Sequence, residues 1–264
     1  MIDPLELEPI VQEVIQLSYK AGEAILEIYN TDFEEEYKQD DSPLTKADLA
    51  SNEIICNGLK KLTPEIPIIS EENKTKRYEE RKDWSSCWVV DPLDGTKEFV
   101  KKNDEFTTNV ALIKDGKPIA GVVYIPVYNQ MYYAIKGYGA YKIDENNELT
   151  VITSSSYNPQ SEKVRIVCSR SHLNEATQAF VDWFRNPEIV SKGSSLKFLA
   201  IAEGEADVYP RLAPTMEWDT AAAQIILQEA GGSVTDFNDK TPLIYNKEDL
   251  LNPYFVAKGK EIST

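Results

Sequence analysis

The chain has 264 residues, of which 44 are acidic and 28 basic, giving a net charge of −16 at pH 7. This charge argues against a nucleic-acid polymer or an anionic membrane surface as the main binding partner. With 42% apolar and 27% charged residues, the chain has the composition of a soluble globular protein, large enough for one big domain or two closely packed ones.

No apolar run is long enough to span a membrane, and the N-terminal residues lack the basic and apolar regions of a signal peptide. The three cysteines, Cys56, Cys87 and Cys168, are far apart and form no C-x-x-C motif. Unpaired thiols of this kind are typical of reducing compartments. We therefore expect a cytoplasmic protein without a transmembrane segment, either free or held peripherally at the inner face of the cell membrane.

The first half predicts two long helices followed by a largely antiparallel sheet. Apolar residues recur at helical spacing over residues 5–29, and a second helix is expected to start at Ser42–Thr45. A short strand is predicted over residues 67–70. Paired apolar runs around Gly-containing turns then predict hairpins of 106–113 with 118–125 and of 130–135 with 140–143.

The second half alternates between strands and helices, which favours a mixed or parallel sheet covered by helices. The predicted strands are 164–168, 188–190 and 206–209, and the predicted helices are 174–184, 195–202 and 215–229. The helical pattern of 174–184 turns Trp183 toward the core. The polar stretch 153–163 predicts a boundary between a domain of residues 1–155 and one of residues 156–264.

The most informative stretch is Trp88–Phe99, W-V-V-D-P-L-D-G-T-K-E-F. Its apolar start predicts a buried strand that delivers Asp91 at its tip, where Pro92 prevents the ladder from continuing. Gly95 then permits a tight turn, and a helix is expected to begin at Thr96 with its unpaired N–H groups facing the aspartates.

Asp91, Asp94 and the carbonyl of Leu93 between them can converge on one point. Oxygen ligands alone suit a hard divalent cation, Mg²⁺ above all. A helix N-terminus beside such a cation suits a phosphate group. Taken alone, the motif is equally compatible with an ordinary loop in which an aspartate caps a helix.

Three further acids stand where an element begins or ends. Glu71 follows the strand 67–70, Asp48 lies in the first turn of the second helix, and Asp219 lies in the first turn of the helix over 215–229. Taken singly, they are explained by an exposed loop or by the helix dipole.

Together, Glu71, Asp91, Asp94 and Asp219 would form a pocket of four carboxylates, which would need at least two Mg²⁺ ions to be stable. Two such ions can activate a water and stabilise the attacking and leaving oxygens of phosphoryl transfer. Thr96, hydrogen-bonded to Asp48, would orient and deprotonate that water.

The ordered motifs S-E-E (70–72), D-P-L-D-G-T (91–96) and E-W-D-T-A-A (217–222) resemble the Mg²⁺-dependent, lithium-sensitive inositol monophosphatase superfamily. The resemblance covers essentially the whole chain. The segments that resemble its bacterial 3′(2′),5′-bisphosphate nucleotidases are 42–48, 97–99, 169–172, 193–197 and 209–211. The resemblance implies a layered α/β/α/β/α sandwich of the inositol monophosphatase and sugar phosphatase type, and a role in sulfur metabolism.

The resemblance further implies a phosphomonoesterase that removes the 3′-phosphate of adenosine 3′,5′-bisphosphate (PAP) to give AMP, with the sulfated precursor PAPS as a second substrate. The implied metal ligands are Glu71, Asp91, the Leu93 carbonyl, Asp94 and Asp219, and the implied catalytic residues are Asp48, Glu71 and Thr96. The implied substrate contacts are Gly95, Thr96, Ser169, His172, Gly193, Ser194, Ser195, Lys197 and Arg211. Without the resemblance, His172 would be an ordinary surface histidine.

Two alternatives remain at this point. The same chemistry would serve an inositol or sugar monophosphatase, and a non-catalytic nucleotide or metal sensor would use the same scaffold. The pairing of Asp48 with Thr96 disfavours the sensor, because sensing requires no activated water. We expect a small-molecule nucleotide bisphosphate as substrate, and the sequence leaves the oligomeric state open, a homodimer included.

Overall fold

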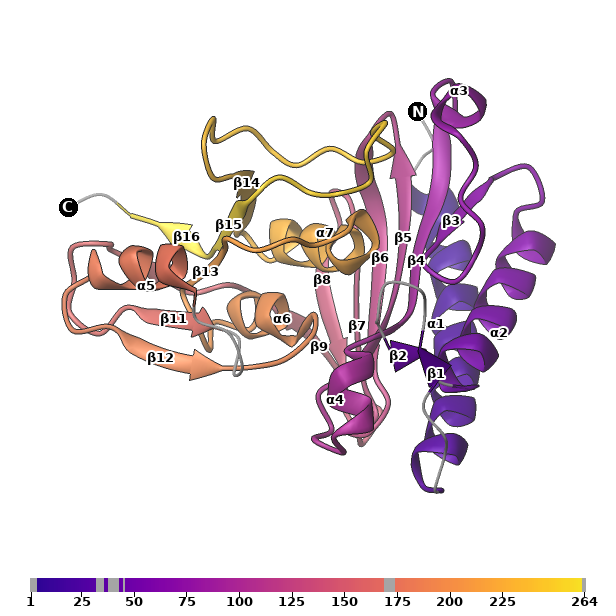
Figure 1. Ribbon diagram of the computed structural model, residues 1–264, viewed down its shortest axis with the longest axis horizontal. Coiled ribbons are helices and arrows are strands. Elements are labelled where there is room, and N and C mark those ends of the chain that lie inside the picture. The colour runs from indigo at the N-terminus through magenta and orange to yellow at the C-terminus, as the bar shows by residue number, and fades with distance from the viewer. Residues whose placement is uncertain (1–3, 32–35, 38–42, 45, 169–173, 263–264) are drawn as a thin grey trace.

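The computed structural model describes residues 4–31, 36–37, 43–44, 46–168 and 174–262. Two mixed sheets are separated by a layer of helices, and further helices cover their outer faces (Figure 1). The order of layers is α/β/α/β/α, so the predicted layered sandwich is confirmed. Within the described residues, none of the helices is long and apolar enough to cross a membrane.

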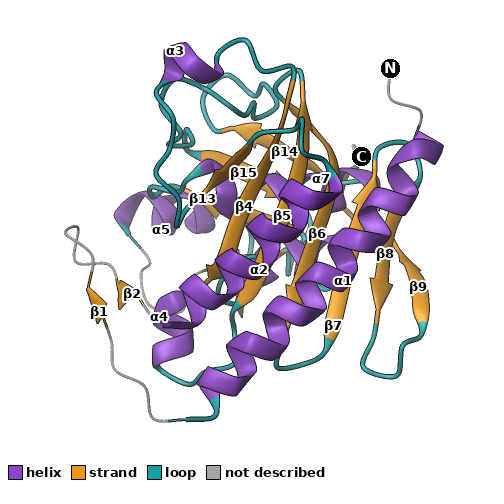
Figure 2. Ribbon diagram, turned by 90° about the vertical axis from the view of Figure 1, so that its right-hand side faces the viewer, coloured by secondary structure: helices purple, strands orange, loops and turns teal. Residues whose placement is uncertain are grey.

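The helices fall into three layers. The outer pair α1 and α2 covers one face of the larger sheet, α6 and α7 lie between the two sheets, and α5 covers the outside of the smaller sheet (Figures 1 and 2). Their bounds are α1 Pro4–Tyr29, α2 Lys46–Leu62, α3 Tyr78–Arg81, α4 Thr96–Val100, α5 Glu175–Asp182, α6 Leu196–Ala202 and α7 Ala221–Glu229, with a 3₁₀ turn η1 at Glu217–Asp219.

The larger sheet has seven strands in sequence order, and only its first pair, β3 with β4, is parallel. The strands are β3 Ile68–Ser70, β4 Ser86–Asp94, β5 Thr107–Lys114, β6 Lys117–Ile125, β7 Gln130–Ile135, β8 Gly139–Ile143 and β9 Leu149–Ile152. Both predicted hairpins are present, because the turns at Gly116 and Gly137 take the positive φ that glycine tolerates. Strand β9 was not predicted.

The smaller sheet has five strands in the order β12-β11-β13-β15-β14, with β11 parallel to β12 and β13 and the remaining pairs antiparallel. The strands are β11 Arg165–Cys168, β12 Glu188–Ser191, β13 Val208–Arg211, β14 Ser233–Asp236 and β15 Phe255–Lys258. Two small pairs complete the fold: β1 Glu36–Tyr37 with β2 Pro43–Leu44, and β10 Ser156–Tyr157 with β16 Lys260–Glu261.

The two halves share one core. Helix α7 belongs to the second half but packs against β5, β6, β7 and β8 of the first, and a single buried cluster contains side chains from both sheets. At Gly121 a Cβ atom would lie 2.6 Å from the carbonyl oxygen of Ala222, so only glycine allows this close approach. The division at residues 155 and 156 stays a prediction.

Two predictions near the site were wrong in detail. Strand β4 does not end before Pro92 but runs on to Asp94, with its register shifted between Asp91 and Asp94. Proline is tolerated there because a bulge leaves its position out of the ladder.

The helix predicted over 215–229 is interrupted. Asp219 ends the 3₁₀ turn η1, and Thr220, with φ −124°, separates it from α7. Thr220 therefore occupies the N-cap position of α7, and Asp219 stands before that helix rather than in its first turn.

The prediction that Trp183 faces the core was also wrong, because the residue is 64% exposed. Asn174 fixes the start of α5 by accepting the Thr177 N–H at 2.8 Å. From this start, the buried positions are Thr177, Val181 and Phe184, which follow helical spacing. Trp183 packs edge-on against Phe184 instead.

Candidate active site

Two adjacent strand ends bring Glu71 and Asp91 together. Strands β3 and β4 pair in parallel with Ser70 opposite Val90, and the Glu71 N–H donates to the carbonyl of Val90 at 3.2 Å. Asp91 is buried, and its Oδ1 accepts the N–H of Leu93 at 3.1 Å. Parallel strands leave the sheet at the same edge, so the shared design of an apolar run ending on an acid places both carboxylates at one point.

Helix α2 closes over these strand ends. Its Ser51 hydroxyl donates to the carbonyl of Pro92 at 2.7 Å, and Asp48 is buried in its first turn. The Thr96 hydroxyl donates to the carbonyl of Leu93 at 3.3 Å. The predicted hydrogen bond between Asp48 and Thr96 stays a prediction.

The glycine of D-P-L-D-G-T is required by its backbone. Gly95 has φ +94°, a left-handed conformation, and a Cβ there would lie 3.0 Å from the carbonyl oxygen of Glu105. The chain then enters α4 at Thr96. This turn sets Asp94 at the mouth of the site while Asp91 remains inside.

Asp94 is bound by two serines of the second half. Its Oδ2 accepts the hydroxyls of Ser194 at 2.5 Å and Ser195 at 3.0 Å. Short bonds to a carboxylate are charge-assisted and strong. The Ser194 hydroxyl also lies 2.8 Å from that of Thr107. The structure thus places both serine hydroxyls on a predicted metal ligand, although the sequence predicted them as substrate contacts.

Asp219 reaches the site from η1. Its Oδ2 accepts the N–H of Met216 at 2.9 Å, which holds the carboxylate across the turn. The Ser195 hydroxyl lies 3.4 Å from the carbonyl oxygen of Asp219. Ser195 therefore touches both Asp94 and Asp219.

The gathered carboxylates oppose one another's ionisation. Burial raises the pKa of Asp91 well above its usual value, and it raises the pKa of Asp219 to about 8. The charges that add to the rise at Asp91 are, in decreasing order, those of Glu71, Asp94, Asp219 and Asp48. Such a cluster is stable when protons or cations offset the negative charge.

The donor set fits a hard divalent cation better than any other group, because every candidate ligand is an oxygen. In the described part of the chain, no three His, Cys, Asp or Glu side chains form a ready-made metal group. Asp94 and Asp219 each direct one oxygen to protein donors, and repulsion acts among the acids. Mg²⁺ would remove that repulsion, with Glu71, Asp91, Asp94, Asp219 and the Leu93 carbonyl as the predicted ligands.

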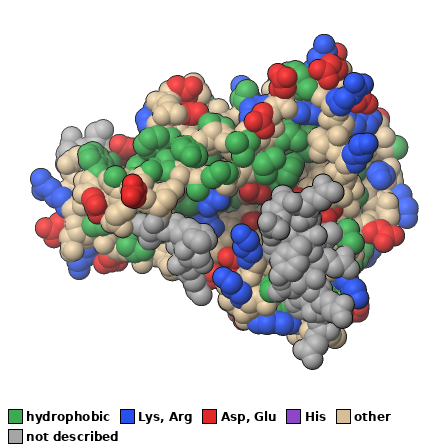
Figure 3. All heavy atoms as spheres, in the orientation of Figure 1, with side chains coloured by type: hydrophobic (Ala, Val, Ile, Leu, Met, Phe, Trp, Pro, Cys, Tyr) green, Lys and Arg blue, Asp and Glu red, His purple; other side chains and the backbone are tan. Residues whose placement is uncertain are grey.

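A pocket of about 200 Å³ joins this acidic cluster to two cations. Its lining includes the acids Asp94, Glu98 and Asp219, the cations Lys197 and Arg211, and Tyr209 and Thr220. Figure 3, drawn in the orientation of Figure 1, shows acidic and basic side chains in the recess at the middle of the molecule. A larger cavity, of about 280 Å³, lies elsewhere, and its Lys142 is paired with Glu203 at 2.6 Å.

The two cations of the pocket differ in their contacts. Lys197 is buried, its ammonium donates to the Ser194 carbonyl at 2.7 Å, and burial lowers its pKa to about 8. Arg211 donates to the carbonyl of Pro214, whereas its buried Nε has no hydrogen-bond partner among the described residues. A buried cationic donor in this state favours an anionic ligand.

The remaining predicted contacts are partly placed. Gly193 packs so closely on the first half that an added Cβ would lie 3.1 Å from Cγ of Glu98. Ser169 and His172 lie outside the described residues. Sequence reasoning missed Glu98 and Tyr209, which line the pocket. Both lie in segments that carried the family resemblance, 97–99 and 209–211, but neither was predicted as a site residue.

The fold and the site together define a class: layered α/β/α/β/α proteins with an acidic cluster at strand ends between two halves. The model of the inositol monophosphatase family matches residues 6–262. The chain therefore belongs to the inositol monophosphatase family.

Named relatives are similar over nearly the full length. The chain is 44% identical to the 3′(2′),5′-bisphosphate nucleotidase CysQ of Salmonella typhimurium, over 93% of this chain and 98% of that protein. It is 43% identical to the CysQ of Escherichia coli K12, with the same shares. The crystal structure of CysQ from Bacteroides thetaiotaomicron matches with a TM-score of 0.86 at 41% identity, covering 97% of this chain and 99% of the other.

Proposed function

We propose that this protein is a Mg²⁺-dependent 3′(2′),5′-bisphosphate nucleotidase that converts PAP to AMP and phosphate, and that also accepts PAPS. Membership of the inositol monophosphatase family and the nucleotidases at 43–44% identity support this assignment. The observation that carries it is the pocket itself, in which carboxylates and two cations line the same cavity of about 200 Å³.

A substrate with two phosphates fits this division of charge. The scissile 3′-phosphate would lie beside Asp94, Gly95 and Thr96, and the 5′-phosphate beside Lys197 and Arg211. An inositol monophosphate carries only one dianion, so it would leave both cations without an anionic ligand and the buried Nε of Arg211 without a partner among the described residues. Buried donors left unpaired oppose binding, which favours the bisphosphate.

In the proposed reaction a water oxygen bonds to phosphorus as the bond from phosphorus to O3′ breaks. Bound Mg²⁺ would lower the pKa of the attacking water and stabilise the charge that develops on the phosphate and the leaving oxygen. Asp48 and Thr96 hold the attacking water in line and take its proton. A proton reaches O3′, so AMP leaves with a free hydroxyl and inorganic phosphate is released.

The test is phosphate release by the purified protein from PAP, PAPS, inositol 1-phosphate and fructose 1,6-bisphosphate, with Mg²⁺ or with EDTA. We expect kcat/KM for PAP to exceed that for inositol 1-phosphate, and no turnover in EDTA. Lithium, compared with potassium at equal ionic strength, is expected to inhibit as it does in this family.

The outcomes separate the alternatives. Preference for inositol 1-phosphate or fructose 1,6-bisphosphate would replace the nucleotidase by an inositol or sugar phosphatase. Absence of phosphate release from all four substrates would favour a non-catalytic sensor. Full activity in EDTA would overturn the metal-dependent chemistry.

A further inference from the structure

One segment of the second half, residues 243–252, crosses between the larger sheet and the turn that carries Asp219. On one side, the Tyr245 N–H donates to the carbonyl of Gly116, in the turn between β5 and β6, at 3.0 Å. On the other side, the Asn252 side chain donates to the Met216 carbonyl at 2.7 Å. The segment therefore contacts both halves of the protein, the larger sheet at the turn between β5 and β6 and the second half beside η1.

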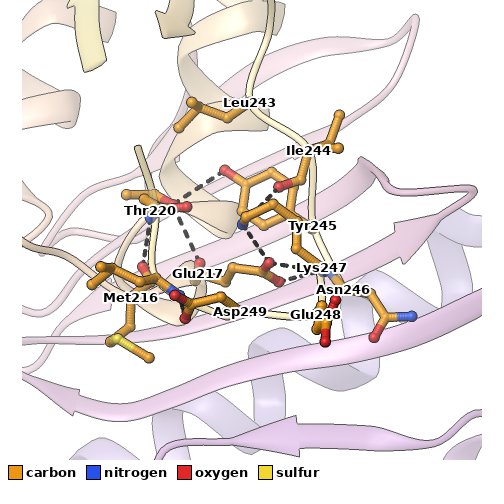
Figure 4. A network of polar contacts seen from close by, with 12 residues as sticks. Met216, Glu217, Thr220, Leu243, Ile244, Tyr245, Asn246, Lys247, Glu248 and Asp249 are labelled. Atoms are coloured by element: carbon orange, nitrogen blue, oxygen red, sulfur yellow. Dashed lines mark hydrogen bonds and ion pairs between the residues drawn. The ribbon is translucent and has the colours of Figure 1, made fainter. Parts of the chain in front are cut away.

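Glu217 binds the middle of this segment from the second half. The side chain is 0% exposed, and its two oxygens are aimed at the chain around Asn246 and Lys247 (Figure 4). Oε2 accepts the Asn246 N–H at 2.6 Å, and Oε1 accepts the Lys247 N–H at 3.1 Å and pairs with Nζ of Lys247 at 2.5 Å. Glu217 is the first residue of η1, which ends at Asp219.

Arg81 binds the same residues from the first half. Its buried guanidinium donates through Nη1 to Asn246 Oδ1 at 2.8 Å and the Lys247 carbonyl at 2.5 Å, and through Nη2 to the Glu248 carbonyl at 2.8 Å. The Asn246 side chain returns a bond to the Arg81 carbonyl at 2.9 Å. Arg81 stands at the end of α3, on the connection that begins with Glu71 after β3.

A chain of polar contacts thus runs from Arg81, on the connection that follows Glu71, through residues 246–248 to Glu217, at the start of the turn that ends with Asp219. Glu71 directly follows β3 of the larger sheet, and Asp219 lies at the end of η1 in the second half. Residues 246–248 therefore link the two parts of the chain that carry these acids, in addition to the shared core.

We propose that residues 246–248, clamped by Arg81 and Glu217, are a strap that sets the separation of Glu71 and Asp219 for Mg²⁺. Arg81 and Glu217 are positioning residues, which touch neither the metal nor the substrate. This inference rests on the proposed function, since it assigns the strap to the Mg²⁺ site of that enzyme. A fork-shaped guanidinium suits the task because it fixes three acceptors at once, whereas a lysine would hold one point.

The experiment measures Mg²⁺ binding by titration calorimetry without substrate, together with Tm and the Mg²⁺ dependence of PAP hydrolysis. The variants are Arg81→Lys, Glu217→Gln and the double substitution. We expect each single variant to bind Mg²⁺ about 10- to 100-fold more weakly, as when residues that orient metal ligands are lost. Saturating Mg²⁺ is expected to restore most of kcat. The double variant is expected to be no weaker than the weaker single variant, because both residues act through the same segment.

The matched control is Arg165→Lys. Arg165 likewise joins two segments, bonding Asp207 at 2.6 Å and the Gly204 carbonyl at 2.6 Å, at the end of β13 opposite to Arg211. This variant is expected to lower Tm without changing Mg²⁺ affinity. Lys247→Met serves if Glu217→Gln fails to fold, because it removes the ion pair and keeps both backbone bonds, and a smaller loss of affinity is expected.

Unchanged Mg²⁺ affinity in Arg81→Lys and Glu217→Gln, with Tm lowered as in Arg165→Lys, would reduce the strap to a purely structural contact and overturn the proposal. If the losses of Mg²⁺ affinity in the two single variants add up in the double variant, Arg81 and Glu217 do not act through the same segment. If the unsubstituted protein neither binds Mg²⁺ nor releases phosphate, the proposed function fails instead. The two failures are therefore distinguishable.

Discussion

The two ends of the active-site pocket are built in opposite ways from the same physical effect. At the acidic end, burial and repulsion raise the pKa of Asp91 and of Asp219. At the cationic end, burial lowers the pKa of Lys197 to about 8, with the charge of Asp94 opposing the change. At each end, burial disfavours the charged form of the side chains. A bound ligand of the opposite charge would restore that form. Under the proposed function, the acidic end would bind the metal and the cationic end a phosphate.

The ends also differ in how firmly they are held. The carboxylates are fixed by strand pairing, by the serines bonded to Asp94 and by the Met216 N–H bonded to Asp219. At the other end, Arg211 keeps a buried Nε without a partner among the described residues. The metal end is therefore the more preorganised, and changes there should cost more activity than changes at the cationic end.

The largest effect is expected from Asp91→Asn. It removes a buried negative charge from the predicted metal ligands, and several kcal/mol of charge stabilisation in the transition state corresponds to about a 1,000-fold loss of kcat or more. The assay is PAP hydrolysis at saturating Mg²⁺. Tm in EDTA is the control and should not fall, because the substitution relieves repulsion. An active variant would refute the preorganised metal end.

Lys197→Ala is expected to cost less, about 10- to 100-fold in kcat/KM for PAP, the value of one charge-assisted bond to phosphate. Hydrolysis of inositol 1-phosphate should change little. Lys192→Ala, which removes the same charge from the neighbouring cavity, is the matched control. Equal losses on both substrates would show that Lys197 acts through its bond to the Ser194 carbonyl, and so on the metal end.

Ser195→Ala tests whether a serine bonded to Asp94 acts on the metal end or on the substrate. It removes a 3.0 Å bond to Asp94 while the Ser194 bond remains, so Mg²⁺ affinity should fall by about 3- to 10-fold. Ser155→Ala is the control, since the Ser155 hydroxyl makes an equivalent 2.7 Å bond to Asp207 away from the pocket. Weaker PAP binding at saturating Mg²⁺, with Mg²⁺ affinity intact, would instead identify Ser195 as a substrate contact.

The smallest effect is a pH dependence of stability. Because the pKa of Asp219 is raised to about 8 in the folded protein, its protonated form stabilises the metal-free fold at low pH, and this contribution is lost as the pH rises toward and through 8. Tm in EDTA should therefore fall over that range, and the increase in Tm caused by Mg²⁺ should grow. Asp219→Asn should flatten both trends, and a slope that survives this substitution would have another origin.

Much of this architecture was predictable because the local patterns were strong. An apolar run followed by an acid predicted the strand ends that carry Glu71 and Asp91, and alternation predicted the hairpins. The motifs also placed Asp94 and Asp219 in one site, which the structure brings to the same pocket. The strand ends and the hairpins depend on neighbours in sequence, whereas the meeting of Asp94 with Asp219 was inferred from the ordered motifs.

What escaped prediction depends on residues far apart in the chain. The extension of β4 past Pro92 needs the bulge against β5, and the break at Thr220 needs the contacts of residues 243–252. The bonds from Ser194 to Asp94 and from Arg81 to Asn246 link positions that no spacing rule connects. Hydrogen bonds between distant segments are set by the packing of the two sheets, which a single sequence does not display.

The placement of α7 has a consequence for synthesis on the ribosome. The larger sheet is complete once β9 has emerged, but its inner face, which includes Ile113, Val123 and Tyr132, belongs to the cluster that α7 closes. Until residues 221–229 leave the exit tunnel, α7 does not cover that face. The nascent chain therefore exposes apolar side chains on one face of its larger sheet, which favours aggregation. The same helix follows directly after Asp219, so the growing chain gains the cover of this face and the last of the predicted metal ligands together.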